Sequence, residues 1–397
     1  MTENENIDTL TQWLVTEARF LNDGVILVDE LGNRLVKAGI PISRMRIAQR
    51  FANPLLAAWG VIWRPNQHAE DYVVATKTLS TDVWIGSPFQ YVSENRRSLR
   101  QRLSGLTTGI EHHVFYELAE QGGTDFYAMP LEYGDGTVQG MSIVTNHPDG
   151  FTDQHLETLE AMRHPLALVM EPIAARRSLS SLLKTYLGKG PASAVANGAI
   201  HQGDVTRIEA IIMMNDMRNF TQKSTEWTEE ELLKSLSRYF EIIVTAVHNH
   251  NGEILKFIGD GVLSVFPIKN GLPAKAQAEN AIAAAFDART ALENWNTERK
   301  AIGLSEIEFG TGVHLGEVIY GNVGSPDRLD FTVIGDAVNV ASRIENMTKE
   351  TGKPFLCSSA VAGLATEKTR EIGEYSIRGL MGKVKLFTWT AEAENKM

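Results

Sequence analysis

The sequence contains one cysteine, Cys357, among 397 residues. A single cysteine excludes a disulfide within the chain and is typical of proteins in a reducing compartment, so we expect a cytoplasmic location. The chain also lacks an apolar run close to the roughly 20 residues that a membrane-spanning helix requires. Its opening residues are polar and acidic, which argues against a secretory signal. We therefore expect no membrane span.

Positive charge is scarce as well. Lysine and arginine total 38 against 49 aspartates and glutamates, which gives a formal net charge of -11 at pH 7. This balance argues against nucleic acid as a partner, because such partners require a basic surface. It does not exclude a nucleotide, since a few local cations and a metal can bind phosphates inside an acidic protein. The composition, 43% hydrophobic and 22% charged, is that of an ordinary globular protein.

A break in hydrophobic periodicity divides the chain, whose length favours two domains. Residues 188–204, GKGPASAVANGAIHQGD, combine glycine, proline and serine after a stripe of apolar residues between 179 and 187. We therefore expect a first domain over 1–175, a helical connector and linker over 176–205, and a second domain over 206–397.

Apolar spacing predicts an α+β architecture for both domains. In the first domain it predicts helices over 7–21, 42–60 and 151–171, strands over 60–65 and 71–78, and a hairpin over 125–146. In the second it predicts strands over 208–216 and 382–389, strand pairs over 253–266 and 307–324, and helices over 228–250, 274–300 and 336–350. The order strand, helix, hairpin, helix, strand indicates a ferredoxin-like antiparallel sheet with flanking helices and additions.

Two aspartates can meet at one edge of this sheet. Asp216 ends the buried strand 208–216, and Asp260 lies between two glycines at the hairpin tip LKFIGDG (255–261). Without a cation the two carboxylates would repel each other, and one would become protonated. Mg²⁺ commonly binds one or two carboxylates and completes its coordination with phosphate oxygens and water. The alternative is that each aspartate only caps a turn.

A later helix carries Asn339 and Arg343 four residues apart, on one face. An arginine can bind two phosphate oxygens through parallel hydrogen bonds, and an asparagine one turn earlier can orient a sugar. The alternative is a solvated polar face.

Four segments then give these residues a common context: NDMRNFT (215–221), LKFIGDG (255–261), GVHLGEVIYGNVG (312–324) and DFTVIGDAVNVASR (330–343). As an ordered set they resemble the class III nucleotidyl cyclases, over residues 205–395. The resemblance implies a ferredoxin-like catalytic domain that works as a homodimer with active sites between the chains. It also implies conversion of a nucleoside triphosphate to its 3′,5′-cyclic monophosphate and pyrophosphate.

The resemblance assigns a metal site by position. It implies that Asp216 and Asp260 supply carboxylates, and Met217 a backbone carbonyl, to two Mg²⁺ or Mn²⁺ ions per active site. Asn215 and Asn219 stand where family members usually have a small residue and a glycine. Asparagine tolerates left-handed torsions better than most residues, so we expect the loop to close on phosphates.

The resemblance also assigns substrate contacts. Asn339 and Arg343 match the catalytic pair that steadies the ribose and the phosphate in the transition state, and Arg328 lies where many members have a further phosphate-binding arginine. Lys256 and Thr332 match the two base-selecting positions. A lysine only donates, which suits N1 of adenine, and a threonine hydroxyl can accept from N6, whereas guanine presents the reverse pattern. The sequence therefore favours ATP and resembles the subgroup of adenylate cyclases that have threonine at this position.

We expect an adenylate cyclase in which one chain supplies Asp216 and Asp260 and its partner supplies Lys256, Thr332, Asn339 and Arg343. One alternative is a catalytically silent, nucleotide-binding signalling module. Another is a cyclase of different base specificity, for guanine or pyrimidine nucleotides.

The first domain carries a weaker resemblance. Its hairpin at 125–146 and the helix after it look like the closing part of a GAF-like or PAS-like sensor domain, which implies regulation by a small molecule or protein, or dimerisation alone. Four aromatic residues can either line a pocket or pack the core: Trp59, Trp63, Trp84 and Phe89. His112 and His113 lack further ligands at suitable spacing, so we predict no metal there.

Overall fold

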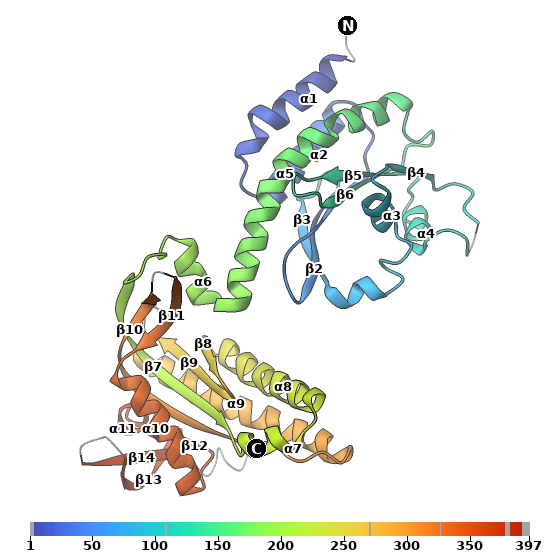
Figure 1. The fold of residues 1–397 in the computed structure, drawn as a ribbon. Coiled ribbons are helices and arrows are strands. Elements are labelled where there is room, and N and C mark those ends of the chain that lie inside the picture. Colours follow the sequence, from blue (N-terminus) through green and yellow to red (C-terminus); the bar gives the residue numbers. More distant parts are fainter. Residues whose placement is uncertain (1–3, 108, 270, 326, 378–381, 391–397) are drawn as a thin grey trace. The chain divides into compact units, whose positions relative to one another are not determined.

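A computed structural model describes residues 4–107, 109–269, 271–325, 327–377 and 382–390, with side chains from residue 9 onward. Contacts divide the chain into two compact units, Met1–Leu182 and Leu183–Met397 (Figure 1). Among the helices that the structure describes, none combines the length and apolar character required to cross a bilayer.

The first unit is built on a six-stranded sheet in the order β3-β2-β1-β6-β5-β4, with every neighbouring pair antiparallel. Its strands are β1 (Arg44–Arg50), β2 (Leu56–Trp63), β3 (Glu70–Ala75), β4 (Leu99–Arg102), β5 (Asp125–Glu132) and β6 (Val138–Thr145). Its helices are α1 (Asn4–Thr16), η1 (Ala18–Phe20), α2 (Gly24–Lys37), η2 (Thr76–Ser80), α3 (Pro88–Asn95), α4 (His113–Glu120) and α5 (Asp153–Leu187). The predicted hairpin over 125–146 is confirmed as β5 and β6.

The predicted helix over 42–60 is wrong, because these residues form β1 and most of β2. Buried and partly exposed residues alternate strictly along β1, which is the period of a strand. The two strands are separated by Asn53-Pro54, and a residue before proline avoids helical torsions. The helix of this region is α2 instead, whose start is capped by Asp23 Oδ1 at 2.7 Å from the Val25 amide.

Two of the four candidate aromatics belong to the core. Trp59 and Trp63 on β2 are buried against α2, and a methyl group at Gly24 or Gly32 would lie 2.4 Å from the corresponding indole. Glycine at these positions therefore allows the helix to approach the sheet. Core packing is confirmed for this pair, whereas Trp84 and Phe89 line a cavity on the other side.

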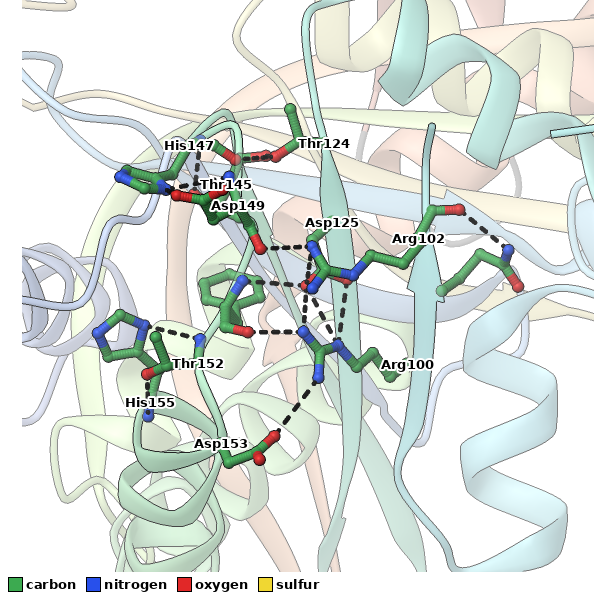
Figure 2. Close-up of polar contacts among 12 residues, drawn as sticks. Arg100, Arg102, Thr124, Asp125, Thr145, His147, Asp149, Thr152, Asp153 and His155 are labelled. Atoms are coloured by element: carbon green, nitrogen blue, oxygen red, sulfur yellow. Dashed lines mark hydrogen bonds and ion pairs between the residues drawn. The ribbon is translucent and has the colours of Figure 1, made fainter. Parts of the chain in front are cut away.

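A buried carboxylate ties the start of α5 to the sheet (Figure 2). Asp125 is inaccessible to solvent, and its Oδ2 accepts hydrogen bonds from Arg100 Nη2 at 2.8 Å and from the Phe151 amide at 3.0 Å. Arg102 lies 3.6 Å from the same oxygen. Figure 2 shows both guanidinium groups directed at Asp125, and the Arg100 side chain also reaches Asp153 in the first turn of α5.

The second unit contains an eight-stranded sheet in the order β13-β14-β12-β10-β7-β9-β8, with β11 paired to β10. Its strands are β7 (Val205–Met217), β8 (Glu253–Ile258), β9 (Gly261–Pro267), β10 (Phe309–Ser325), β11 (Arg328–Ile334), β12 (Phe355–Ser358), β13 (Thr369–Ser376) and β14 (Lys383–Trp389). Its helices are α6 (Lys189–Ala196), α7 (Phe220–Glu226), α8 (Glu229–Asn249), α9 (Ala274–Ala301), α10 (Asp336–Thr351) and α11 (Ser359–Ala362). The path β7-α8-β8-β9-α9-β10 has the predicted ferredoxin-like order.

The predicted strand pair over 307–324 is also wrong. A single strand, β10, runs through this segment for 17 residues, and its hairpin partner is β11, a strand that the sequence pattern did not predict. The glycines of this segment are therefore not turn residues. Gly310, Gly312 and Gly316 lie under α10 instead, and a methyl group at Gly312 would meet the Ala341 carbonyl at 2.4 Å. The predicted linker over 188–204 is partly helical, since it contains α6.

Candidate active site

The end of β7 places Asp216 beside the tip of the β8–β9 hairpin. Asn215 pairs with Val262 on one side of β7, and Asp216 pairs with Gly310 on the other. A methyl group at Gly261 would lie 3.6 Å from Asp216 Oδ1, so this carboxylate faces the hairpin tip.

The second aspartate points to the same place. Burial raises the pKa of Asp260, and the nearby charge of Asp216 raises it further, while a hydrogen bond from the Met217 backbone lowers it. Gly259 adopts φ 63°, which allows the tight turn that presents this carboxylate. The structure therefore brings together Asp216, Asp260 and the backbone of Met217.

These groups suit a hard divalent cation. Carboxylate and backbone oxygens are the donors that Mg²⁺ and Mn²⁺ prefer, and the mutual repulsion of the two acids shows that the site favours added positive charge. Lys349 Nζ lies 3.3 Å from Asp216 Oδ2 and supplies part of that charge. Among the described residues there is no cluster of three or more histidine, cysteine or carboxylate ligands, so phosphate or water oxygens would have to complete the coordination.

A buried ion pair supports the strand end. Arg218 Nη1 lies 2.9 Å from Glu345 Oε1 on α10, and its other nitrogen contacts Thr348. The side chains of Arg218 and Glu345 are 15% and 3% exposed, so water screens this pair little. The sequence motifs predict neither of these residues, nor Lys349. The available signal was helical spacing, because Glu345, Thr348 and Lys349 stand at positions i, i+3 and i+4 of one helix and therefore share a face.

The loop after β7 has the geometry expected from its asparagines. Asn219 adopts φ 56°, a left-handed torsion that asparagine tolerates. Asn215 is buried, and its amide donates to Thr311 Oγ1 at 2.8 Å. Asparagine therefore replaces the usual small residues without disrupting β7.

The predicted base-selecting residues lie near each other on β8 and β11. Lys256 forms an ion pair with Asp330, two residues before Thr332 on the same strand. Thr332 is half-buried and is paired with Gly321. Arg328 is exposed at the start of β11, and it pairs with Ser325 across the hairpin.

The structure does not bring Asn339 to the carboxylates of the same chain. α10 begins over the Gly316 end of β10, where Ala337 packs, and ends beside Asp216 through Lys349. Ten residues separate Asn339 from Lys349, which corresponds to about 15 Å along a helix. Arg343 lies between them and is half-buried.

The sequence also offers three candidates for a phosphate-binding cation near the C-terminus: Arg378, Lys383 and Lys385. Arg378 lies outside the described residues. Lys385 Nζ is 3.5 Å from Glu371 Oε2, and Lys383 is exposed at the start of β14.

Comparisons with known proteins identify a protein family that matches the region containing this site. Residues 205–392 match the family model described as the adenylate and guanylate cyclase catalytic domain. Adenylate cyclase 1 of Rhizobium meliloti is 37% identical over 176 residues, which is 44% of this chain and 26% of that protein. An adenylate cyclase of Anabaena cylindrica is 36% identical over 166 residues, which is 41% of this chain and 32% of that protein. The chain thus spans about a quarter to a third of the length of these relatives.

Among solved structures, the adenylyl cyclase CyaB from P. aeruginosa is 26% identical. The match covers 47% of this chain and 95% of that one, with a TM-score of 0.44. The four motifs, the ferredoxin-like order of elements and the family match all fall within the second unit. Residues 205–392 of this chain therefore match the class III adenylate and guanylate cyclase catalytic domain.

Proposed function

We propose that the protein is an adenylate cyclase, which converts ATP to 3′,5′-cyclic AMP and pyrophosphate. The observation that carries this proposal is the convergence of Asp216 and Asp260 at the end of β7, within a domain that matches the cyclase family. Two relatives named adenylate cyclase support the choice of nucleotide. Guanylate cyclase is the second candidate, because the family model covers both activities.

Base selection rests on Lys256 and Thr332. The Lys256 ammonium donates to N1 of adenine, and the Thr332 hydroxyl accepts from N6. Asp330 contacts Lys256 and so holds its side chain near Thr332. With guanine the lysine would face a donor at N1, and such a polar mismatch strongly discriminates between substrates.

In this proposal Asp216, Asp260 and the Met217 carbonyl hold two Mg²⁺ or Mn²⁺ ions. The metal, when bound, would neutralise phosphate charge and make the ribose 3′-hydroxyl a better nucleophile. The Asn339 amide orients the ribose so that its 3′-oxygen lies in line with the α-phosphate. The Arg343 guanidinium stabilises the charge that develops on that phosphate, and Arg328 adds a further contact to the triphosphate.

The active site in this proposal lies between two identical chains. The distance along α10 between Asn339 and the carboxylate end supports it, because one chain holds the acids and the ribose-binding amide apart. A two-fold arrangement would place each half beside the complementary half of its partner and create two sites.

The first domain, over 1–175, is proposed to be a GAF-like or PAS-like regulatory domain, joined through 176–205 to the catalytic domain over 206–397. A six-stranded sheet with a cavity against one face supports a sensor role. We also propose a cytoplasmic location, which the single cysteine supports.

A four-nucleotide turnover assay tests the activity. The full-length chain is incubated with ATP, GTP, CTP and UTP in competition, with Mg²⁺ or Mn²⁺, and the cyclic products are separated by chromatography. We expect cyclic AMP as the main product. Cyclic GMP as the main product would favour the second candidate, and absence of any cyclic product with both metals would indicate a silent nucleotide-binding module.

A further inference from the structure

One face of β1 in the first unit carries an unusual concentration of arginine. In the sequence RMRIAQR (44–50) the side chains alternate between the two faces of the sheet. Met45 and Ile47 enter the main core, so the residues between them face the opposite side. On that side lies a cavity of about 270 Å³, close to the lower end of the range for small-molecule sites.

Small residues of the sheet leave room for this cavity. Ala48 on β1 is paired with Gly140 on β6, and neither fills the space above the strands. Phe89 from α3 lies over Gly140, where a methyl group would be 2.3 Å from its ring. Trp84 lines the same cavity, so one part of the wall is aromatic.

Another part of the wall is positively charged. Four arginines line the cavity: Arg44, Arg46, Arg50 and Arg64. Glu117 is the one acidic residue among the lining residues of the described structure, and it lies 3.9 Å from His113. The Arg46 guanidinium stacks on the Phe89 ring at 5.1 Å and donates to the Tyr72 hydroxyl.

The charge of Arg44 is compensated only in part. Within the described part of the chain this residue has no ion pair, and its Nε is buried without a hydrogen-bond partner. Burial lowers the pKa of Arg44 to about 10, and the nearby charges of Arg46 and Arg64 contribute to this shift, while Tyr72 and Glu117 oppose it only in part. A buried cation without a partner is unfavourable, and an anion in the cavity would relieve that cost.

We propose that this cavity binds a small organic anion, with its acidic group held by Arg44 and Arg64 and its apolar body against Trp84 and Phe89. The planar guanidinium group of arginine binds carboxylate and phosphate oxygens through paired hydrogen bonds. The aromatic rings of Trp84 and Phe89 suit a flat apolar body. The proposal concerns the first unit alone, so it does not depend on the cyclase activity.

The test compares three probes on the full-length chain: 2-naphthoate, its neutral analogue 2-naphthamide, and inorganic phosphate. Binding is measured by ligand-observed NMR. We expect 2-naphthoate to bind about tenfold or more tightly than the amide, because hydrogen bonds to charged groups are the stronger ones. We also expect it to bind more tightly than phosphate, which cannot use the aromatic wall. Equal binding of acid and amide, binding of phosphate alone, or binding of none of the three overturns the proposal.

Variants locate the site. Arg44→Met should remove most of the preference for 2-naphthoate over 2-naphthamide, whereas Arg97→Met, the same change at an exposed arginine away from the cavity, should leave it unchanged. A melting curve of each variant shows whether it is folded. If Arg44→Met fails to fold, Arg64→Met takes its place in the comparison. An unchanged preference in a folded Arg44→Met or Arg64→Met chain contradicts the assignment.

Discussion

Single residues at the end of β7 control the charge of the candidate metal site. Asp216 and Asp260 repel each other, and Lys349 offsets this repulsion only in part, at 3.3 Å from one carboxylate oxygen. A divalent cation would replace this weak compensation with direct coordination. The apo protein should therefore be less stable than the metal-bound protein, and the difference should depend on both acids.

Replacing Asp260 with asparagine should separate metal binding from folding. We expect Asp260→Asn to lower cyclase turnover by about 100-fold or more, because one of the two metal carboxylates is lost. In a chelator its Tm should equal or exceed that of the wild type, since the repulsion with Asp216 is gone. Mn²⁺ should raise the Tm of the wild type but not of the variant, as measured by differential scanning fluorimetry.

The matched control is Glu367→Gln, the same carboxylate-to-amide change at an exposed position of the same unit. It should retain the Mn²⁺-dependent shift in Tm. A full metal-dependent shift in Asp260→Asn would show that this residue is not a metal ligand.

The contacts of Lys256 and Thr332 predict a change in base preference. We expect the double variant Lys256→Glu, Thr332→Cys to lower the ratio of kcat/KM for ATP over GTP by about tenfold or more, because the hydrogen-bond pattern for adenine is removed. Lys275→Glu, the same charge change at an exposed residue, should leave the ratio unaltered. Retention of the wild-type ratio in the double variant would contradict the proposed base recognition.

Among single residues, the sequence predicts the candidate metal ligands better than the residues that hold them in place. Motif positions predicted the acids, and the structure places Asp216 and Asp260 together. The contacts of Arg218, Glu345 and Lys349 depend on how α10 lies across the sheet, which local patterns do not encode. Long-range ion pairs of this kind become visible only once the strands and helices are assembled.

At the scale of elements, the interface between β10 and α10 connects the two halves of the candidate site. α10 reaches from the segment that carries Asn339 to Lys349 beside Asp216. It lies so close to the strand that an added methyl group at Gly312 would be 2.3 Å from the Glu345 backbone nitrogen. The position of every functional group on α10 therefore depends on this close approach.

Gly312→Ala should displace α10 from β10. Because the contacting atoms are backbone, they cannot move aside by changing a rotamer, so we expect a loss of stability of about 1–3 kcal/mol, as for other overpacked sites. Turnover should fall with it, since Arg343 and Lys349 would shift relative to the acids. Denaturant unfolding and the cyclic AMP assay measure the two effects.

Gly134→Ala provides the comparison, because its nearest neighbour, Glu171 Oε1, would be at an ordinary 3.5 Å. It should change neither stability nor turnover appreciably. If Gly312→Ala behaved in the same way, the close packing of α10 on β10 would not be correct.

Element prediction from sequence succeeded where one period dominated. The hairpin at 125–146 and the helices α8 and α10 carry clear patterns, whereas α9 is rich in alanine, and all are confirmed. The error over 42–60 arose because arginines and alanines of β1 and β2 also fit a helical spacing. The error over 307–324 arose because glycines that serve helix packing resemble glycines that make turns.

At the scale of the whole molecule, the proposed active site requires two chains. A mixture of two inactive variants tests this requirement. Asp216→Asn removes a metal ligand, and Arg343→Ala removes the phosphate contact. Both sites of each homodimer are therefore inactive. In a mixed dimer one site would combine both defects, and the other would be complete.

Co-expression of the two variants should therefore restore about a quarter of wild-type turnover, since half of randomly paired dimers are mixed and each has one intact site of two. Each variant alone should remain inactive, and the cyclic AMP assay measures all three samples. Without recovery in the mixture, despite mixed dimers detected by native mass spectrometry, the site would have to be contained within one chain.

The glycines of β10 also set how freely this sequence can change. Gly310, Gly312 and Gly316 occupy positions where any side chain would collide with Arg218, Glu345 or Ala337. A saturation library of these three positions, screened for cyclase activity, should accordingly reject almost every replacement, although none of the three glycines is expected to touch the nucleotide. Engineering of substrate choice should therefore leave these three glycines unchanged and vary residues of β8 and β11 instead.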